Sequence, residues 1–215
     1  MDISEVFKVT KEIGAYSAIP AIGVLIWNLR RIKGLQVHIG ILAVLAFSLD
    51  QLSSHISKLG LTTTNINLSY GLVELIIVLF IFKSLLDQRD FKLVYVVIPM
   101  MILVHMVASR QLLPSETTIY MKYIQIEACV IIPFCLTFLY QLLSQDPLVP
   151  LARLRIFWVV VGFLIYYTTT FFMWVTAGTM GIEMEIIYAI WIINHFATVL
   201  KHSTFVYFLW KPQPN

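Results

Sequence analysis

The chain has 215 residues, of which 59% are hydrophobic and only 13% are charged. An average soluble domain carries charge on about 25% of its residues, and the mean hydropathy of this chain is +0.84. With 15 basic and 12 acidic residues, the chain has too few charges to cover a soluble core of this size. The composition excludes a disordered chain, a soluble single-core enzyme and a nucleic-acid binder, and it indicates an integral protein of a lipid bilayer.

Seven segments are apolar over the length of about 20 residues that a helix needs to cross a bilayer. In chain order they span residues 13–29, 37–55, 67–86, 91–109, 118–143, 157–177 and 186–210. Polar or turn-forming stretches separate them, and the polar residues 1–12 do not resemble a cleaved signal peptide. The sequence predicts an all-α seven-transmembrane helix bundle that forms one domain, residues 1–215, with no soluble domain.

Basic residues predict the orientation of this bundle, because cytoplasmic loops of membrane proteins are enriched in Lys and Arg. The C-terminus and the loops after the first, third and fifth segments, with the adjoining helix ends, hold nine basic residues: Arg30, Arg31, Lys33, Lys83, Arg89, Lys92, Arg153, Arg155 and Lys211. The other side holds five: Lys8, Lys11, Lys58, Arg110 and Lys122. We therefore expect the N-terminus outside and the C-terminus in the cytoplasm.

Ionisable side chains inside the predicted spans are the main functional lead, because each costs roughly 2.5 kcal/mol or more at the centre of a bilayer. Most of them fall in the outer half of the bundle in the predicted orientation. We expect a polar cavity there that binds a small ligand or protons, lined by Asp50, His55, Glu74, His105, Glu127, Asn194, His195 and Lys201. His202 flanks this set.

The last predicted span carries a polar stripe on an otherwise apolar helix. Asn194, Thr198 and Lys201 follow the i, i+4, i+7 spacing of one helix face. This face should point into the bundle, because lipid cannot satisfy polar groups. The simplest pairing joins Lys201 to Glu74, in a buried salt bridge between the seventh and third spans. The other residues also have plain explanations, such as an interfacial position for His55 or a local partner for Asp50 and Glu127.

Three specific chemistries can be compared with these residues. Lys201 and Glu74 could serve as the Schiff-base lysine and counter-ion of a retinal protein, but no retinal-pocket signature accompanies them. His55, Glu74, His195 and His202 partly match seven-helix zinc hydrolases, but the last two lie seven residues apart, about 10 Å along the axis. A proton-coupled carrier of small molecules is the third alternative. The sequence assigns no catalytic residue, no metal ligand and no particular cofactor, and Cys129 and Cys135 match no metal or disulfide motif.

The second half of the chain resembles a known family. Residues 142–147 read LLSQDP, and residues 155–167 open with Phe157-Trp158, continue to Gly162 and end in the pair Tyr166-Tyr167. In the last span, Asn194, Lys201 and Phe205 precede the closing residues 209–211. Over residues 115–211 this pattern resembles the small seven-helix membrane proteins of Bacteroidota that are encoded beside, or fused to, sensor histidine kinases.

The resemblance implies a receptor or sensory module in the bacterial inner (cytoplasmic) membrane, acting in a two-component system. Because no kinase domain is attached, the signal would pass in trans to a sensor histidine kinase or another signalling protein. The family assigns no ligand and no catalytic residue to this chain. The sequence leaves open whether the chain forms a homo-oligomer. A proton-coupled transporter and a metal-dependent membrane hydrolase remain as alternative functions.

Overall fold

The computed structural model describes residues 2–86, 100, 116–144, 150–177 and 184–210. All regular structure in these ranges is helical, and they contain no strand. The helices are α1 (Ile3–Tyr16), α2 (Ile19–Asn28), α3 (Leu35–Lys58), α4 (Thr64–Leu85), α7 (Glu116–Ser144), α8 (Arg155–Ala177) and α9 (Met184–Leu209), with a short 3-10 turn, η1 (Leu151–Arg153), before α8.

Six stretches of the described chain are long and apolar enough to cross a membrane, with α1 and α2 together forming the first of them, Ile3–Asn28. The prediction of an all-α, multi-pass membrane protein is thus confirmed in its class. The fourth predicted span, residues 91–109, lies outside the described residues apart from Met100. The count of seven spans therefore stays a prediction, as does the orientation of the termini.

The first span begins ten residues earlier than predicted, at Ile3. Residues 1–12 are polar in sequence, yet most of them form α1, an amphipathic helix whose charged side chains are exposed and whose Thr10 and Gly14 are buried. The helix then breaks at Ser17 and Ala18. Pro20 explains the break, because its nitrogen cannot donate the hydrogen bond that would continue the helix, and a proline fits well in the first turn of a new one.

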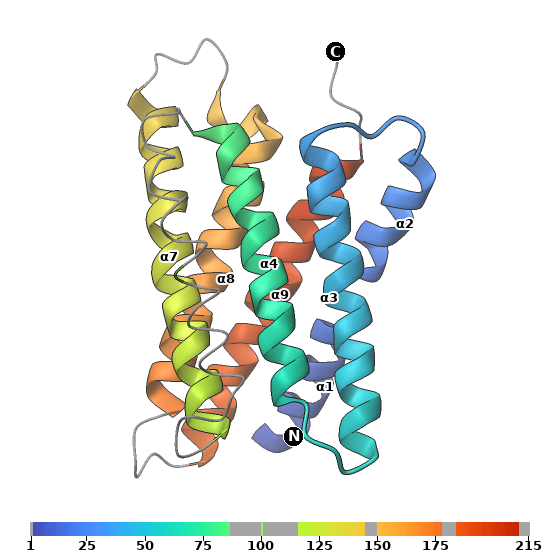
Figure 1. The fold of residues 1–215 in the computed structure, drawn as a ribbon, viewed down its shortest axis with the longest axis vertical. Helices are drawn as coiled ribbons and strands as arrows, with labels where there is room; N and C mark the ends of the chain where they lie inside the picture. The colour runs from blue at the N-terminus through green and yellow to red at the C-terminus, as the bar shows by residue number, and fades with distance from the viewer. Residues whose placement is uncertain (1, 87–99, 101–115, 145–149, 178–183, 211–215) are drawn as a thin grey trace.

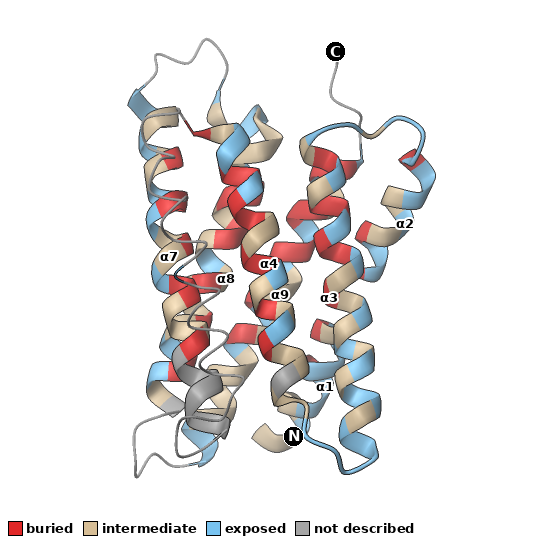
Figure 2. Cartoon of the chain, in the orientation of Figure 1, coloured by how far each residue is buried: buried red, intermediate tan, exposed pale blue. Residues whose placement is uncertain are grey.

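Helix α9 is the centre of the bundle. It packs against α8, α1, α2 and α3, while α4 packs between α3 and α7, and α7 packs against α8. Figure 1 shows α1 beginning at one end of the bundle and α9 ending at the other. The buried side chains form one continuous core between these helices (Figure 2). The inward-facing polar residues of α9 are therefore surrounded by several helices.

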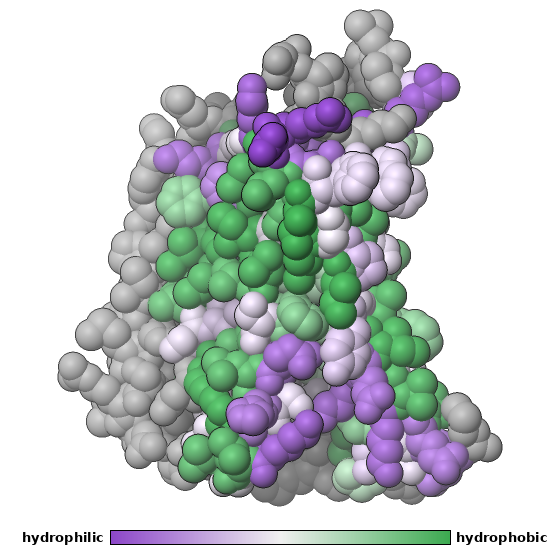
Figure 3. All heavy atoms as spheres, turned by 90° about the vertical axis from the view of Figure 1, so that its right-hand side faces the viewer, coloured by the Kyte–Doolittle hydropathy of each residue, from purple (hydrophilic) through white to green (hydrophobic). Residues whose placement is uncertain are grey.

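The outer surface is largely apolar, as the lipid environment requires. Large hydrophobic side chains such as Trp27, Phe172 and Phe196 point away from the core, with 88%, 60% and 61% of their surface exposed. In Figure 3 an apolar band covers the middle of one face, with hydrophilic side chains above it and over its lower part. This distribution is typical of a helix bundle embedded in a bilayer.

Candidate functional site

A buried ion pair lies at the centre of the bundle. Lys201 Nζ on α9 is 3.1 Å from Glu74 Oε1 on α4, and the side chains are only 4% and 6% exposed. The hypothesis that these two residues pair is confirmed. Burying one charge in an apolar core without the other is strongly unfavourable, so each residue holds its partner in place. The pair thus joins two helices that are 127 residues apart in sequence.

Aromatic side chains complete the surroundings of this pair. Lys201 Nζ lies 3.6 Å from the centre of the Tyr166 ring on α8, in cation–π geometry. Tyr70, one helical turn before Glu74 on α4, places its phenol beside the Glu74 carboxylate. Lys201 therefore contacts α4 and α8 at once. A change in its position would affect both of these helices.

A second carboxylate is buried close to the pair. Glu127 on α7 is 4% exposed, and its carboxylate interacts electrostatically with both Glu74 and Lys201. Its Oε1 atom has no hydrogen-bond partner among the described residues. Two buried carboxylates therefore lie near one buried ammonium group, and one of them, Glu74, is in contact with it. Their charges balance only when one carboxyl group carries a proton.

The close approach of α4 and α7 brings Glu127 to this position. A Cβ atom on Gly71 of α4 would lie 2.9 Å from Tyr123 Cε1 and 3.3 Å from Glu127 Oε2. Gly71 precedes Glu74 by three residues, so both lie on the same side of α4. The missing side chain at Gly71 lets Tyr123 and Glu127 pack closely against α4. We refer below to Glu74, Glu127 and Lys201 as the buried charge cluster.

A third carboxylate, that of Asp50, lies beside the buried charge cluster but is exposed. Its carboxylate on α3 interacts electrostatically with Lys201 and Glu74, yet Asp50 is exposed, whereas the three members of the cluster are buried. The site therefore contains three carboxylates around one lysine. One of these carboxylates is reachable from outside the packed core.

Three of the remaining predicted site residues, His55, Asn194 and His195, lie away from the buried charge cluster in the described bundle. Asn194 accepts hydrogen bonds at Oδ1 from Thr170, at 2.8 Å, and from Thr169, at 3.3 Å, which ties α9 to α8. His55 is exposed near the end of α3. His105 lies outside the described residues.

The two histidines of α9 both face α1 and the break that follows it. The His195 ring is 5.7 Å from the Phe7 ring and 6.1 Å from the Trp191 ring, and Gly14 of α1 packs beside it. His202 is 1% exposed, and its Nδ1 atom lies 2.6 Å from the Ser17 hydroxyl. For neither histidine does the Nε2 atom have a hydrogen-bond partner in the described part of the chain.

This arrangement does not match the zinc-hydrolase alternative. Glu74 binds Lys201, His202 contacts Ser17 and His195 packs against Phe7, so these side chains do not converge on one point. Across the described ranges, no group of three or more His, Cys, Asp or Glu residues could hold a metal ion together.

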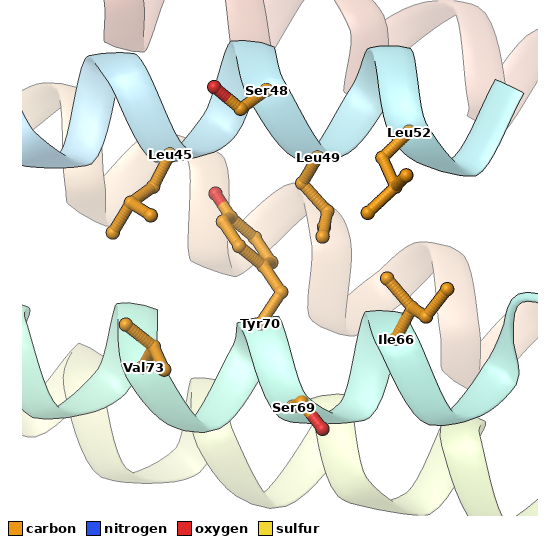
Figure 4. Close-up of a pocket in the computed structure, with 8 residues that line it drawn as sticks. All are labelled: Leu45, Ser48, Leu49, Leu52, Ile66, Ser69, Tyr70 and Val73. Atoms are coloured by element: carbon orange, nitrogen blue, oxygen red, sulfur yellow. The ribbon is translucent and has the colours of Figure 1, made fainter. Parts of the chain in front are cut away.

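A groove of about 450 Å³ separates the second half of α3 from the first half of α4. Its walls are apolar apart from three hydroxyl groups, and it is lined by Leu45, Ser48, Leu49, Leu52, Ile66, Ser69, Tyr70 and Val73. Figure 4 shows Tyr70 extending from α4 toward α3, between Leu45 and Leu49. Because the same tyrosine lies beside Glu74, the groove is adjacent to the buried charge cluster.

Sequence reasoning did not assign Tyr70, Tyr166 and Ser17 to the site. Tyr70 precedes Glu74 by four residues, and this spacing could have indicated that they share a face of the helix. Tyr166 lies in an aromatic run in which nothing marks the one ring that meets the lysine. Ser17 became recognisable only through the break between α1 and α2, which brings its hydroxyl to His202.

A scan against protein-family models, a search of curated proteins and a search of solved structures each give no match for this chain.

Proposed function

We propose that the protein is a membrane sensory module that binds protons at the buried charge cluster and signals to a partner in trans. One observation carries the proposal: Lys201 pairs with Glu74, and the buried carboxylate of Glu127, whose Oε1 has no partner among the described residues, interacts electrostatically with both. Such a group changes its charge balance when it gains or loses one proton. Ion pairs of this kind are better suited to fixing or switching an arrangement than to stabilising it.

The cluster offers a direct route from proton binding to helix movement. When Glu127 is protonated, Lys201 has one buried anionic neighbour, Glu74, and the observed pair is favoured. When Glu127 loses its proton, both carboxylates compete for the ammonium group, which also lies against Tyr166. The two states differ in the forces between α4, α7, α8 and α9, so a change in pH would shift the population of helix arrangements.

We further propose seven spans, with the N-terminus outside and the C-terminus in the cytoplasm of a bacterial inner membrane. In Figure 1, α4 and α7 run in the same direction, so the end of α4 at Leu85 and the start of α7 at Glu116 lie at opposite ends of the bundle. Residues 91–109 are apolar enough to make that crossing. The predicted positive-inside bias supports the orientation.

The proposed partner is a sensor histidine kinase, and the resemblance of residues 115–211 to kinase-associated seven-helix proteins supports it. The surface available to such a partner lies at the end of the bundle where α2 and α9 end and α8 begins (Figure 1). Arg30 and Arg31 follow α2, and Arg153 and Arg155 lie at the start of α8. Co-purification from native membranes tests this partner, and recovery of the chain without any kinase would contradict the proposal.

Tryptophan fluorescence of the protein in nanodiscs tests proton sensing. Trp174 of α8 and Trp191 of α9 lie 5.5 Å apart between ring centres, so they report movement between the two helices. We expect fluorescence to change with pH in the wild type and in the control Glu185→Gln, which alters an exposed carboxylate of α9. Glu127→Gln should abolish the change, because the variant cannot lose the proton. An unaltered titration in Glu127→Gln would overturn the proposal.

A proton-coupled carrier is the second candidate, and the groove between α3 and α4 favours it. The groove of about 450 Å³ is large enough for a small molecule, and Tyr70 connects it to Glu74. Uptake into proteoliposomes under an imposed proton gradient separates the two functions. Solute uptake that depends on Glu127 would support the carrier, whereas a pH-dependent change in fluorescence without uptake would support the sensor.

A further inference from the structure

The inward side of α3 is packed in its first half and open in its second half. Ile39, Ala43, Ala46 and Asp50 follow the i, i+4, i+7, i+11 spacing of one helix side. The first three are 0%, 0% and 8% exposed, whereas Asp50 is exposed. Ser54 and Ser57 continue the same side beyond Asp50, and both are exposed. Asp50 thus marks the boundary between the closed and the open part of the bundle.

Buried hydrogen bonds close the opposite end. Asn28 Nδ2 donates to the backbone carbonyl of Leu209 at 3.0 Å, and Gln36 Nε2 donates to the carbonyl of Phe208 at 3.3 Å. Both amide side chains are buried, and the Phe208 and Leu209 side chains are fully buried beside them. Such packing leaves no room for water between α2, α3 and the end of α9.

Asp50 lies between the open end of the bundle and the buried charge cluster. Its carboxylate interacts electrostatically with Lys201 on α9 and with Glu74 and Tyr70 on α4. Lys201 and Glu74 are 3% and 5% exposed, so they have little contact with water themselves. On the neighbouring α1, the charged side chains Lys8, Lys11 and Glu12 are exposed. Figure 3 shows hydrophilic side chains gathered over the lower part of this side of the bundle.

We infer that protons reach the buried charge cluster from one side of the membrane only, through Asp50. That side is the end of the bundle where α3 ends and α1 begins, which is the outer side in the proposed orientation. Asp50 accepts a proton from water and passes it through the Glu74 carboxylate to Glu127, which returns Asp50 and Glu74 to their ionised forms. The transfer of protons through Asp50 rests on the proposed function. The opening of the bundle on one side does not depend on it.

Cysteine labelling tests the opening independently of any sensing role. In a background with Cys129→Ser and Cys135→Ser, we would introduce Asp50→Cys, Ser54→Cys or Ala43→Cys, each on the inward side of α3. A membrane-impermeant thiol reagent would then be applied to either side of the membrane. We expect Asp50→Cys and Ser54→Cys to react from one side only and at least about tenfold faster than Ala43→Cys, because thiol reactivity follows exposure.

Several labelling results would overturn the one-sided opening. They are equal reaction of Asp50→Cys from both sides, no reaction of either Asp50→Cys or Ser54→Cys, and reaction of Ala43→Cys as fast as that of Asp50→Cys. The Ser54→Cys variant keeps the test valid if Asp50→Cys fails to fold.

A pH-jump experiment tests the role of Asp50 in proton transfer. Asp50→Asn keeps the size of the side chain but cannot carry a proton. We expect its fluorescence response to a pH jump to be slower than that of the wild type by at least about tenfold, whereas Glu127→Gln loses the response itself. A wild-type rate in Asp50→Asn would overturn the transfer role. If the wild type showed no pH response while the labelling remained one-sided, the opening would stand and the proton-sensing function would fall.

Discussion

The Nδ1 atom of His202 lies 2.6 Å from the Ser17 hydroxyl, which joins α9 to the break between α1 and α2. The same hydroxyl oxygen lies 2.5 Å from the carbonyl oxygen of Gly14. A serine hydroxyl has one proton to donate and two lone pairs, so it can donate to Gly14 and accept from His202. His202 follows Lys201 directly on α9. The residue that contacts the helix break is therefore the sequence neighbour of the lysine in the buried charge cluster.

Loss of the Ser17 hydroxyl should destabilise the protein. Ser17→Ala would leave both ring nitrogens of the buried His202 without a described partner, and we expect a loss of about 1–3 kcal/mol. Ser203→Ala is the matched control, since the exposed Ser203 hydroxyl bonds only the Val199 carbonyl of its own helix. Thermal unfolding in detergent measures both variants. Equal melting temperatures in the two would contradict a structural role for the contact.

Replacing Lys201 should lower the free energy of unfolding more than replacing Glu74. Lys201→Met leaves Glu74 and Glu127 buried without a cation, and we expect a loss of about 3–5 kcal/mol near neutral pH. Glu74→Gln should cost less, because Glu127 remains as a second carboxylate for Lys201. Unfolding curves of both single variants and of the double variant would also give the interaction energy between Lys201 and Glu74.

Acid should partly rescue the lysine variant. In Lys201→Met the folded state favours protonated carboxyl groups, so it binds more protons than the unfolded state and gains stability as the pH falls. We therefore expect the gap in melting temperature from the wild type to narrow between about pH 7 and about pH 5. A gap that widened on acidification would show that the two carboxylates are not the cause of the instability.

The tight contact between α4 and α7 should not tolerate a methyl group at Gly71. A Cβ atom there would lie 2.9 Å from Tyr123, so Gly71→Ala should destabilise the protein by about 1–3 kcal/mol through overpacking. In the control Gly23→Ala the new Cβ meets no atom within 4 Å, and a gain of up to about 1 kcal/mol is expected from helix propensity. Melting temperatures that changed in the same direction would exclude the contact as the cause.

The number of spans can be tested with reporters at the two ends of the chain. Seven spans place the N-terminus and the C-terminus on opposite sides of the membrane, whereas six place them on the same side. We expect a reporter active only in the cytoplasm to work at the C-terminus and one active only outside to work at the N-terminus. Reporters of the same kind working at both ends would contradict the seven-span proposal.

Much of the fold followed from local properties of the sequence. The apolar runs around Glu74 and Lys201 predicted helices that the structure contains, because a run of about 20 apolar residues has few alternatives to a spanning helix. The pairing of these two residues was the simplest hypothesis, since a buried charge needs an opposite charge on a facing helix, and the structure confirms it. The helical start at Ile3 did not follow, because an amphipathic helix with exposed charges reads as a polar tail.

The side chains near Lys201 were harder to predict, because the sequence gives the side of a helix on which a residue lies but not the helix that faces it. Asn194 and His195 are neighbours in sequence, yet one bonds to α8 and the other packs against α1. Glu127 reaches the ion pair only because Gly71, more than 50 residues earlier, lets α7 approach α4 closely.

The sequence by itself determined that this is a helical membrane protein with a few buried charges, because hydropathy and helical periodicity are properties of the chain alone. Only the tertiary structure decided which of those charges meet, which of them are exposed and where the first span breaks. Each of these depends on the distance between residues far apart in sequence, and close packing between helices fixes that distance.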